Sequence, residues 1–140
     1  MTKMLEDGAS LDEVRALFDT DRFAHGLCGC EVKEASRGHA VCTLSIDPER
    51  HLNGMKAVMG GALFTLADFA LAVACNYGEE PSVSASNTIE FLDAARGTVL
   101  TATAEADRSG RHLGFYTVDI TDDTGVHVAR MTATCYRNPA

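Results

Sequence analysis

The longest apolar run in the chain carries a single charged residue near its middle. It follows Gly60 and Gly61 and extends to Asn76, and its charged residue is Asp68. An ionised carboxylate away from water costs several kcal/mol or takes up a proton instead. The run is slightly short for a membrane span, which needs about 20 mostly apolar residues. We therefore expect a buried central helix in which Asp68 has a specific role.

Composition places the chain among ordinary globular proteins. Its 140 residues are 46% apolar and fit one domain covering residues 1–140, with 1–9 expected as a disordered tail. The net charge of −8 argues against nucleic acid and anionic membrane surfaces as partners, because both reward clustered Lys and Arg. An anionic ligand would have to meet a local basic patch.

The N-terminal residues lack the apolar core and cleavage site of a signal peptide, so a cytoplasmic protein with five free thiols is expected. His25, Cys28 and Cys30 are spaced closely enough to suggest a metal. However, no second Cys or His pair completes four ligands, and we expect neither a metal nor a cofactor.

Periodicity predicts an α+β domain. A short helix is expected over residues 11–19, where Ser10 provides an N-cap and acidic residues follow. Strand patterns cover residues 26–33, 39–47, 82–92, 97–107, 113–121 and 126–137, with hairpin turns at 36–38, 108–110 and 122–125. These connections are too short for parallel crossovers, so the sheet should be antiparallel with the long helix packed on one face.

The long helix has one narrow stripe of small or polar side chains, formed by Gly61, Thr65, Asp68 and Ala72. No capping side chain precedes Gly60, so the free N–H groups of the helix start can bind an anion or a developing oxyanion. Gly60 and Asp68 are separated by about 12 Å along a helix, which is too far for both to act on one carbonyl. If both serve one reaction, Asp68 must meet the helix start of a second subunit.

The chain resembles the PaaI-like, phenylacetic-acid-degradation type of hotdog-fold thioesterase. That family's signature is roughly Asn-Gly-x-Gly-x-x-His-Gly-Gly followed by Leu-Ala-Asp-x-Ala, and this chain matches it over 53–61 and 66–70. Further likeness lies at 17–19, 74–76, 88–92 and 133–137. The resemblance implies a sheet wrapped round the central helix, homodimers that often pair into tetramers, and metal-free hydrolysis of acyl-CoA, in which coenzyme A is part of the substrate.

The resemblance also assigns roles to individual residues. Asp68 is similar to the catalytic carboxylate, acting as general base or nucleophile, and the Gly60 N–H of the partner subunit's helix polarises the thioester carbonyl. Asn53 matches a residue that positions substrate or water. Ser84 or Ser86 lies where some members place a water-orienting hydroxyl, although both also fit a solvated strand face that alternates from Ser82 to Glu90.

Substrate-binding candidates lie on the helix stripe, the strands and one basic segment. Gly61 and Thr65 belong to the stripe, and Phe91 fits either an acyl tunnel or core packing, as do Phe64, Phe69 and Tyr77. The segment that the family uses beside the pantetheine and nucleotide corresponds here to Arg108, Ser109, Gly110, Arg111, His112 and Leu113. Its cations suit coenzyme A phosphates, with Lys56 and Arg137 as further candidates.

Two residues depart from the signature, Lys56 in place of Gly and Met59 in place of His. Met offers only a weak sulfur acceptor, so the helix start could be held less firmly than by His. This leaves open a non-hydrolytic protein that binds or senses acyl-CoA. A hotdog hydratase or dehydratase is less favoured, because the central helix contains no His.

Overall fold

A computed structural model describes residues 2–138 of the chain. The helices are α1 Leu11–Phe18, the π-helix η1 Arg22–Leu27 and α2 Gly60–Asn76. The strands are β1 Glu31–Ser36, β2 His39–Ser45, β3 Ser82–Phe91, β4 Val99–Ser109, β5 Leu113–Asp122 and β6 His127–Arg137. No helix in the described range is both long and apolar enough to cross a membrane.

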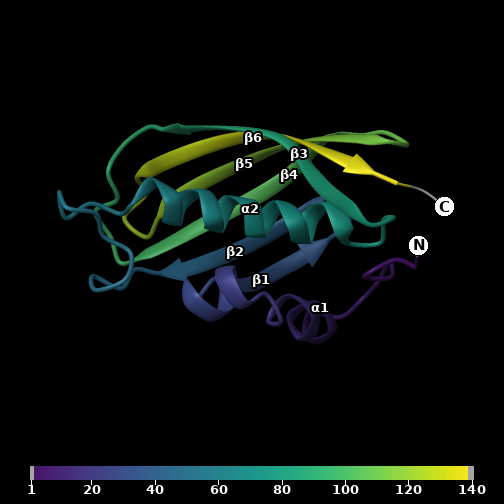
Figure 1. The fold of residues 1–140 in the computed structure, drawn as a ribbon, viewed down its shortest axis with the longest axis horizontal. Coiled ribbons are helices and arrows are strands. Elements are labelled where there is room, and N and C mark those ends of the chain that lie inside the picture. The colour runs from purple at the N-terminus through teal and green to yellow at the C-terminus, as the bar shows by residue number, and fades with distance from the viewer. Residues whose placement is uncertain (1, 139–140) are drawn as a thin grey trace.

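All six strands form one antiparallel sheet in the order β1-β2-β4-β5-β6-β3, as Figure 1 shows. The predicted α+β hotdog architecture is therefore confirmed, including the short N-terminal helix. Ser10 caps α1 as expected, because its hydroxyl accepts a hydrogen bond from the Glu13 N–H at 3.2 Å. The sheet ends at two edge strands, β1 and β3.

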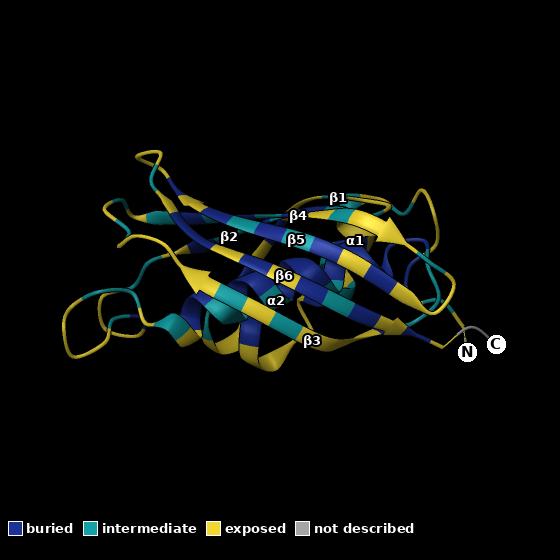
Figure 2. Ribbon diagram, turned by 90° about the horizontal axis from the view of Figure 1, so that it is seen from above, coloured by how far each residue is buried: buried dark blue, intermediate teal, exposed yellow. Residues whose placement is uncertain are grey.

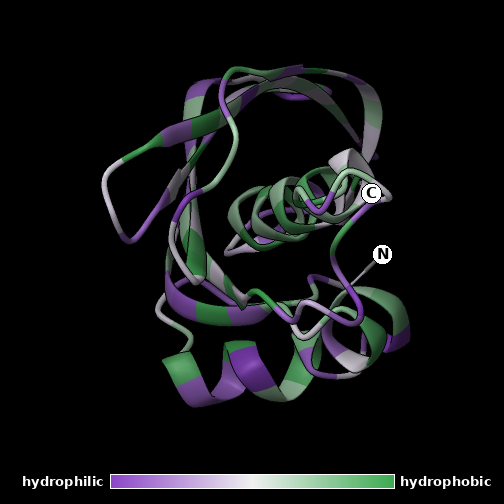
Figure 3. Cartoon of the chain, turned by 90° about the vertical axis from the view of Figure 1, so that its left-hand side faces the viewer, coloured by the Kyte–Doolittle hydropathy of each residue, from purple (hydrophilic) through white to green (hydrophobic). Residues whose placement is uncertain are grey.

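Helix α2 lies in the concave face of the sheet, which curves around it in the end-on view of Figure 3. The core side of α2 is fully buried at Leu66, Ala70 and Val73. The predicted stripe is the less buried side, with Thr65, Asp68 and Ala72 half-buried and Gly61 exposed. Figure 2 shows exposed residues both on this side of α2 and along the neighbouring edge strand β3. The open side of α2 and the free edge of β3 therefore lie together.

Three expectations about local structure were wrong. Residues 26–33 do not form one strand: η1 occupies the first part, Gly29 has a positive φ of 84°, and β1 begins at Glu31. Residues 108 and 109 belong to β4, so the hairpin turn lies at 110–112. The segment 2–9 is not a disordered tail, because Leu5 is buried and its carbonyl accepts from the Gly78 N–H at 3.0 Å.

Candidate functional site

The loop before α2 is held by its own backbone and by Asn53. The Oδ1 atom of Asn53 accepts hydrogen bonds from the N–H groups of Met55 at 2.9 Å and Ala57 at 3.2 Å. The Met59 N–H donates to the carbonyl of His51 at 2.8 Å. Asn53 therefore fixes the loop, and its Oδ1 is already engaged by two backbone donors.

Helix α2 begins with free donors. Met59 occupies the N-cap position with no side-chain cap, and within residues 2–138 the N–H groups of Gly60 and Gly61 have no hydrogen-bond acceptor. Such a helix start favours an anion or an oxygen that gains negative charge. The N–H group that the sequence predicts as a donor, that of Gly60, is therefore free within the described chain.

Phe91 covers this helix start from β3. A Cβ atom added at Gly60 would stand 2.9 Å from Cζ of Phe91, so glycine allows the ring to lie against the backbone. Phe91 is half exposed and lines a hollow of about 470 Å³ together with Asn53, Val58, Gly60, Leu63 and Leu92. The structure therefore brings three predicted site residues together here: Asn53, Gly60 and Phe91.

Asp68 lies half-way along α2 and lines two other hollows. One is shared with Asp21, Phe23 and Thr65, and the other with Ser84, Cys75 and Cys135. Within the described chain its carboxylate makes no hydrogen bond, and burial, followed by the charge of Asp21, raises the pKa of Asp68 above its usual value. A carboxylate that is poorly solvated and weakly engaged is suited to take up a proton or attack a carbon.

Gly60 and Asp68 do not meet within one chain. Eight helix residues separate them, about 12 Å at 1.5 Å per residue, and the hollow at Gly60 shares no lining residue with the two at Asp68. A single subunit therefore does not place both groups on one carbonyl.

A β-bulge separates the two serine candidates on β3. Ser84 pairs with Cys135 and Ser86 with Thr134, so Ala85 is an extra residue between them. Ser84 faces α2 and lines a hollow with Asp68, whereas Ser86 lies on the outer face of the sheet. The expected strict alternation along β3 was wrong, because the bulge puts Ser84 on the same face as Asn87, Ile89 and Phe91.

The basic segment lies at the opposite end of α2 from Gly60, on the β4–β5 connection. The side chains of Arg108, Arg111 and His112 are exposed, and Leu113 starts β5. Ser109 and Gly110 have another task, since the Ser109 Oγ and the Gly110 carbonyl each accept from Nη1 of Arg137 at 2.8 Å. The structure therefore separates three exposed polar side chains, those of Arg108, Arg111 and His112, from two residues that support the fold.

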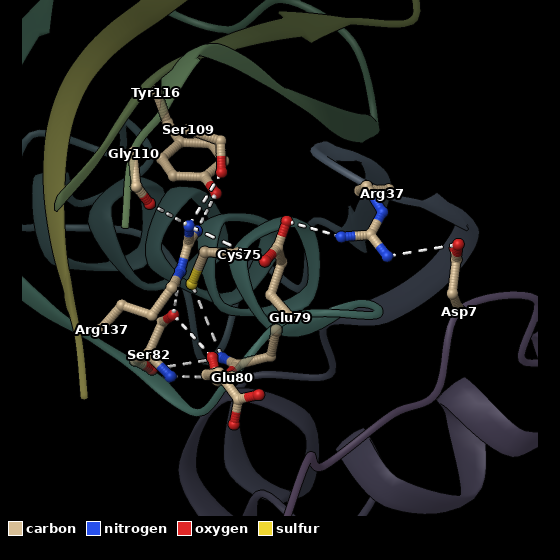
Figure 4. A network of polar contacts seen from close by, with 11 residues as sticks. Asp7, Arg37, Cys75, Glu79, Glu80, Ser82, Ser109, Gly110, Tyr116 and Arg137 are labelled. Atoms are coloured by element: carbon tan, nitrogen blue, oxygen red, sulfur yellow. Dashed lines mark hydrogen bonds and ion pairs between the residues drawn. The ribbon is translucent and has the colours of Figure 1, made fainter. Parts of the chain in front are cut away.

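Arg137 is a structural residue. The residue is only 3% exposed, and its guanidinium also donates to the Ser82 and Tyr116 hydroxyls, at 3.2 and 3.1 Å. Figure 4 shows the network continuing through Glu79 to Arg37 and Asp7. Because Arg137 is buried and already engaged, we exclude it from the residues proposed to bind coenzyme A.

Three residues beside the site were missed from the sequence. Asp21 caps η1 by accepting from the Phe23 and Ala24 N–H groups at 2.9 and 2.8 Å. Phe23 is therefore held beside the stripe of α2. His51 is buried, accepts from the Asp47 N–H and donates to the Cys28 carbonyl, both at 2.8 Å. An Asp before an apolar segment is a helix-start signal that would have indicated η1.

Comparison with known proteins decides the family. The sequence profile of the thioesterase superfamily matches residues 55–129, which include Gly60, Asp68, Ser84 and the basic segment. This chain belongs to the thioesterase superfamily. The predicted family and the predicted enzyme class, a thioester hydrolase, are confirmed.

Relatives of this thioesterase include the acyl-coenzyme A thioesterase PaaI of Escherichia coli, 34% identical over 87% of this chain and 86% of that protein. The E. coli PaaI structure superposes with a TM-score of 0.83 at 31% identity, covering 94% of this chain and 98% of the other. A hypothetical thioesterase protein from Streptococcus pneumoniae, solved with coenzyme A, gives a TM-score of 0.73 at 29% identity, covering 78% of this chain and 85% of the other.

Proposed function

We propose that this protein hydrolyses acyl-CoA thioesters at two sites shared between the subunits of a homodimer. The observation that carries the proposal is the half-buried carboxylate of Asp68, which lies on the open side of α2 with a raised pKa and no hydrogen-bonding partner within the described chain. The names of the E. coli relative and of the S. pneumoniae structure support coenzyme A as the leaving group.

A dimer through the free edge of β3 supplies the missing half of each site. β3 pairs only with β6 among the strands of the described chain, so its other edge can pair with a second β3. Antiparallel pairing about a two-fold axis would place two α2 helices side by side in opposite directions. The start of one helix would then approach the middle of the other, where Asp68 lies.

In the proposed reaction, the Gly60 N–H of one subunit donates a hydrogen bond to the thioester carbonyl oxygen. Asp68 of the other subunit either removes a proton from the attacking water or attacks the carbonyl carbon itself. When Asp68 acts as a base, the C–S bond breaks after hydroxide addition, and the proton taken from water passes from Asp68 to the thiolate of coenzyme A. When Asp68 attacks directly, the C–S bond breaks to leave an acyl anhydride on Asp68, the thiolate takes a proton from solvent, and water then hydrolyses the anhydride to the free carboxylic acid. Ser84, which faces the same hollow as Asp68, is suited to orient the water.

Coenzyme A also needs cations for its phosphates. Arg108, at the end of β4, and Arg111, on the connection to β5, provide them, with the exposed His112 beside them. This part of the chain lies near the far end of α2 from the chain's own Gly60. In an antiparallel pair of helices, that end lies towards the partner's helix start. The arrangement therefore suits one substrate molecule that contacts both subunits.

Complementation between two inactive variants tests the shared site. Asp68→Asn removes the carboxylate and Gly60→Pro removes the N–H. A heterodimer of the two contains one site with both defects and one intact site, so a random mixture should regain about one quarter of the wild-type thiol release. Asp12→Asn, on the exposed face of α1, is the control that should keep full activity. No recovery in a mixture shown to contain heterodimers would reject the shared site.

Met59 favours a second candidate, a protein that binds acyl-CoA without turnover. The family His is absent, and the Met59 side chain is half exposed without a capping hydrogen bond. Acyl-CoA would then raise the melting temperature while no thioester releases thiol. Met59→His separates the two functions, because a large gain in turnover would identify the natural protein as a weakened hydrolase.

A further inference from the structure

Two hollows lie end to end along the open side of α2, because Phe23 and Thr65 line both. The first, of about 340 Å³, also contains Asp68, Phe64 and Ala72. The second, of about 360 Å³, contains Met59, Gly61 and Ala62. From Asp68 to Gly61 the helix advances about 10 Å at 1.5 Å per residue. Together they form one groove, the η1–α2 groove, that starts at Asp68 and runs towards Met59.

The walls of the second hollow are mainly apolar, and two large apolar side chains of the groove are not covered. Phe23 is 59% exposed on η1 and Met59 is 56% exposed at the start of α2. The ε-methyl group of Met59 would lie 3.5 Å from a Cβ added at Gly61, so this side chain lies along the helix start. Apolar side chains left open beside a reactive group indicate a surface that a ligand covers.

The polar side chains around the second hollow are already engaged within the fold. His51 uses both ring nitrogens, on the Asp47 N–H and the Cys28 carbonyl. Arg50 donates to Asp47 Oδ2 and to the Leu27 carbonyl, and the Thr65 hydroxyl donates to the Gly61 carbonyl at 2.8 Å. A group entering this part of the groove therefore finds contact area but few hydrogen-bonding partners.

We propose that the η1–α2 groove receives the acyl group of the thioester and selects unsubstituted apolar chains or rings, with Phe23 and Met59 as the specificity-determining residues. The inference rests on the proposed function and names its substrate class. A hydroxyl on the part of the acyl group in the second hollow would lose its hydration and find few free partners there. Each hollow is within the range of small-molecule sites, which run from about 300 to 1,000 Å³.

The position of Asp68 argues for the acyl group rather than a second protein chain as the occupant. A thioester carbonyl at Asp68 has its sulfur on one side and its acyl carbon on the other, and the groove leads directly away from this carboxylate. Phe23 and Thr65 then contact the first carbons, and Met59 the far end.

The test is a comparison of kcat/KM for acetyl-, hexanoyl-, 3-hydroxyhexanoyl- and succinyl-CoA, which vary the length and polarity of the acyl group. Wild type should prefer hexanoyl-CoA to its hydroxylated analogue by about tenfold or more. Phe23→Ala should lower the hexanoyl-to-acetyl ratio by about tenfold, because one wall of the groove is lost. Leu27→Ala is the matched control, since Leu27 is exposed on the same π-helix but lines neither hollow.

Binding to Asp68→Asn provides a second readout that does not depend on turnover. Hexanoyl-CoA should raise its melting temperature more than acetyl-CoA does, and Phe23→Ala should abolish the difference. If wild type hydrolyses no thioester but this binding preference appears, the hydrolase proposal fails and the groove assignment stands. An unchanged ratio and an unchanged binding preference in Phe23→Ala would overturn the groove assignment. The groove assignment would also be overturned if light scattering showed that Phe23→Ala no longer forms a dimer and kcat/KM fell equally for every acyl-CoA.

Discussion

The ring of Phe91 lies directly over Gly60, with Cζ only 2.9 Å from the position that a Cβ atom would take. Gly60→Pro removes the N–H proposed to bind the carbonyl oxygen, at a helix position where proline is tolerated. Met59 already has the extended backbone that precedes a proline, with ψ at 138°. We expect kcat to fall by about 10²–10³.

Gly60→Ala is the matched control, because its Cβ atom comes equally close to the Phe91 ring while the backbone N–H is kept. Its thiol-release rate should fall less than that of Gly60→Pro. Equal losses in the two variants would show that crowding of Phe91, rather than the missing donor, causes the defect.

Asp21 should shift the pH dependence of hydrolysis through Asp68. Burial and the Asp21 charge raise the pKa of Asp68, so the rate should fall as the pH drops through this raised value and Asp68 becomes protonated. Asp21→Asn keeps a side-chain acceptor for the start of η1 but removes the charge. The acidic limb of the kcat/KM profile should then move to lower pH, whereas an unmoved limb would exclude Asp21 as an influence on the reacting group.

Lys56 has a left-handed backbone conformation, with φ of 62°, at the position where the family signature has glycine. Lys56→Gly should therefore raise the free energy of unfolding by up to about 1 kcal/mol, as relief of backbone strain exceeds the added freedom of the unfolded chain. Urea denaturation measures the change. Lys56→Ala removes the same charge but keeps the strain, so a similar gain in that variant would point to charge instead.

Asn87 has a buried amide oxygen with no hydrogen-bonding partner within the described chain. Asn87→Val should raise the free energy of unfolding by about 1 kcal/mol, because the unsatisfied group disappears and a good strand residue replaces it. Asn76→Val is the contrasting variant, since Asn76 accepts from the Ser82 N–H and donates to the Ala72 carbonyl, at 2.8 and 2.9 Å. A destabilised Asn87→Val dimer would show that assembly provides a partner for the amide.

The buried Arg137 of β6 and the exposed Arg111 of the β4–β5 connection should respond differently to truncation. Arg137→Ala leaves several buried polar groups unpaired and should lower the free energy of unfolding by about 3–5 kcal/mol in urea denaturation. Arg111→Ala should leave stability within about 0.5 kcal/mol of wild type and raise the KM for acyl-CoA. Arg22→Ala, exposed on η1, should change neither quantity. An unchanged KM in Arg111→Ala would exclude Arg111 from coenzyme A binding.

The central features of the fold are predictable from the sequence because they rest on long, regular patterns. The apolar run from Gly60 to Asn76 gives the observed boundaries of α2, and its stripe of small residues is indeed the less buried side. Four β-strands after it follow from alternation and turn residues. The position of Asp68 beside an open surface also follows from the helical period.

The errors arise where one residue changes the local geometry. Cys28, Cys30 and Val32 alternate as a strand would, but Asp21 starts a π-helix and Gly29 turns the chain before β1. The role of Arg137 depends on contacts with residues 28 and 55 positions away, which no local pattern reveals. The groove beside Phe23 likewise exists only because η1 and α2 pack together.

The bulge at Ala85 divides β3 into two halves. Before it, alternate residues present Ser82 and Ser84 towards α2; after it, the inward positions are Asn87, Ile89 and Phe91. Deletion of Ala85 would remove the bulge and leave Ser84 opposite Cys135 and Ser86 opposite Thr134, so both halves of the strand would keep the faces they have now. The strand can therefore gain or lose this one residue in evolution without turning either the hydroxyl beside Asp68 or the residues that cover the helix start away from α2.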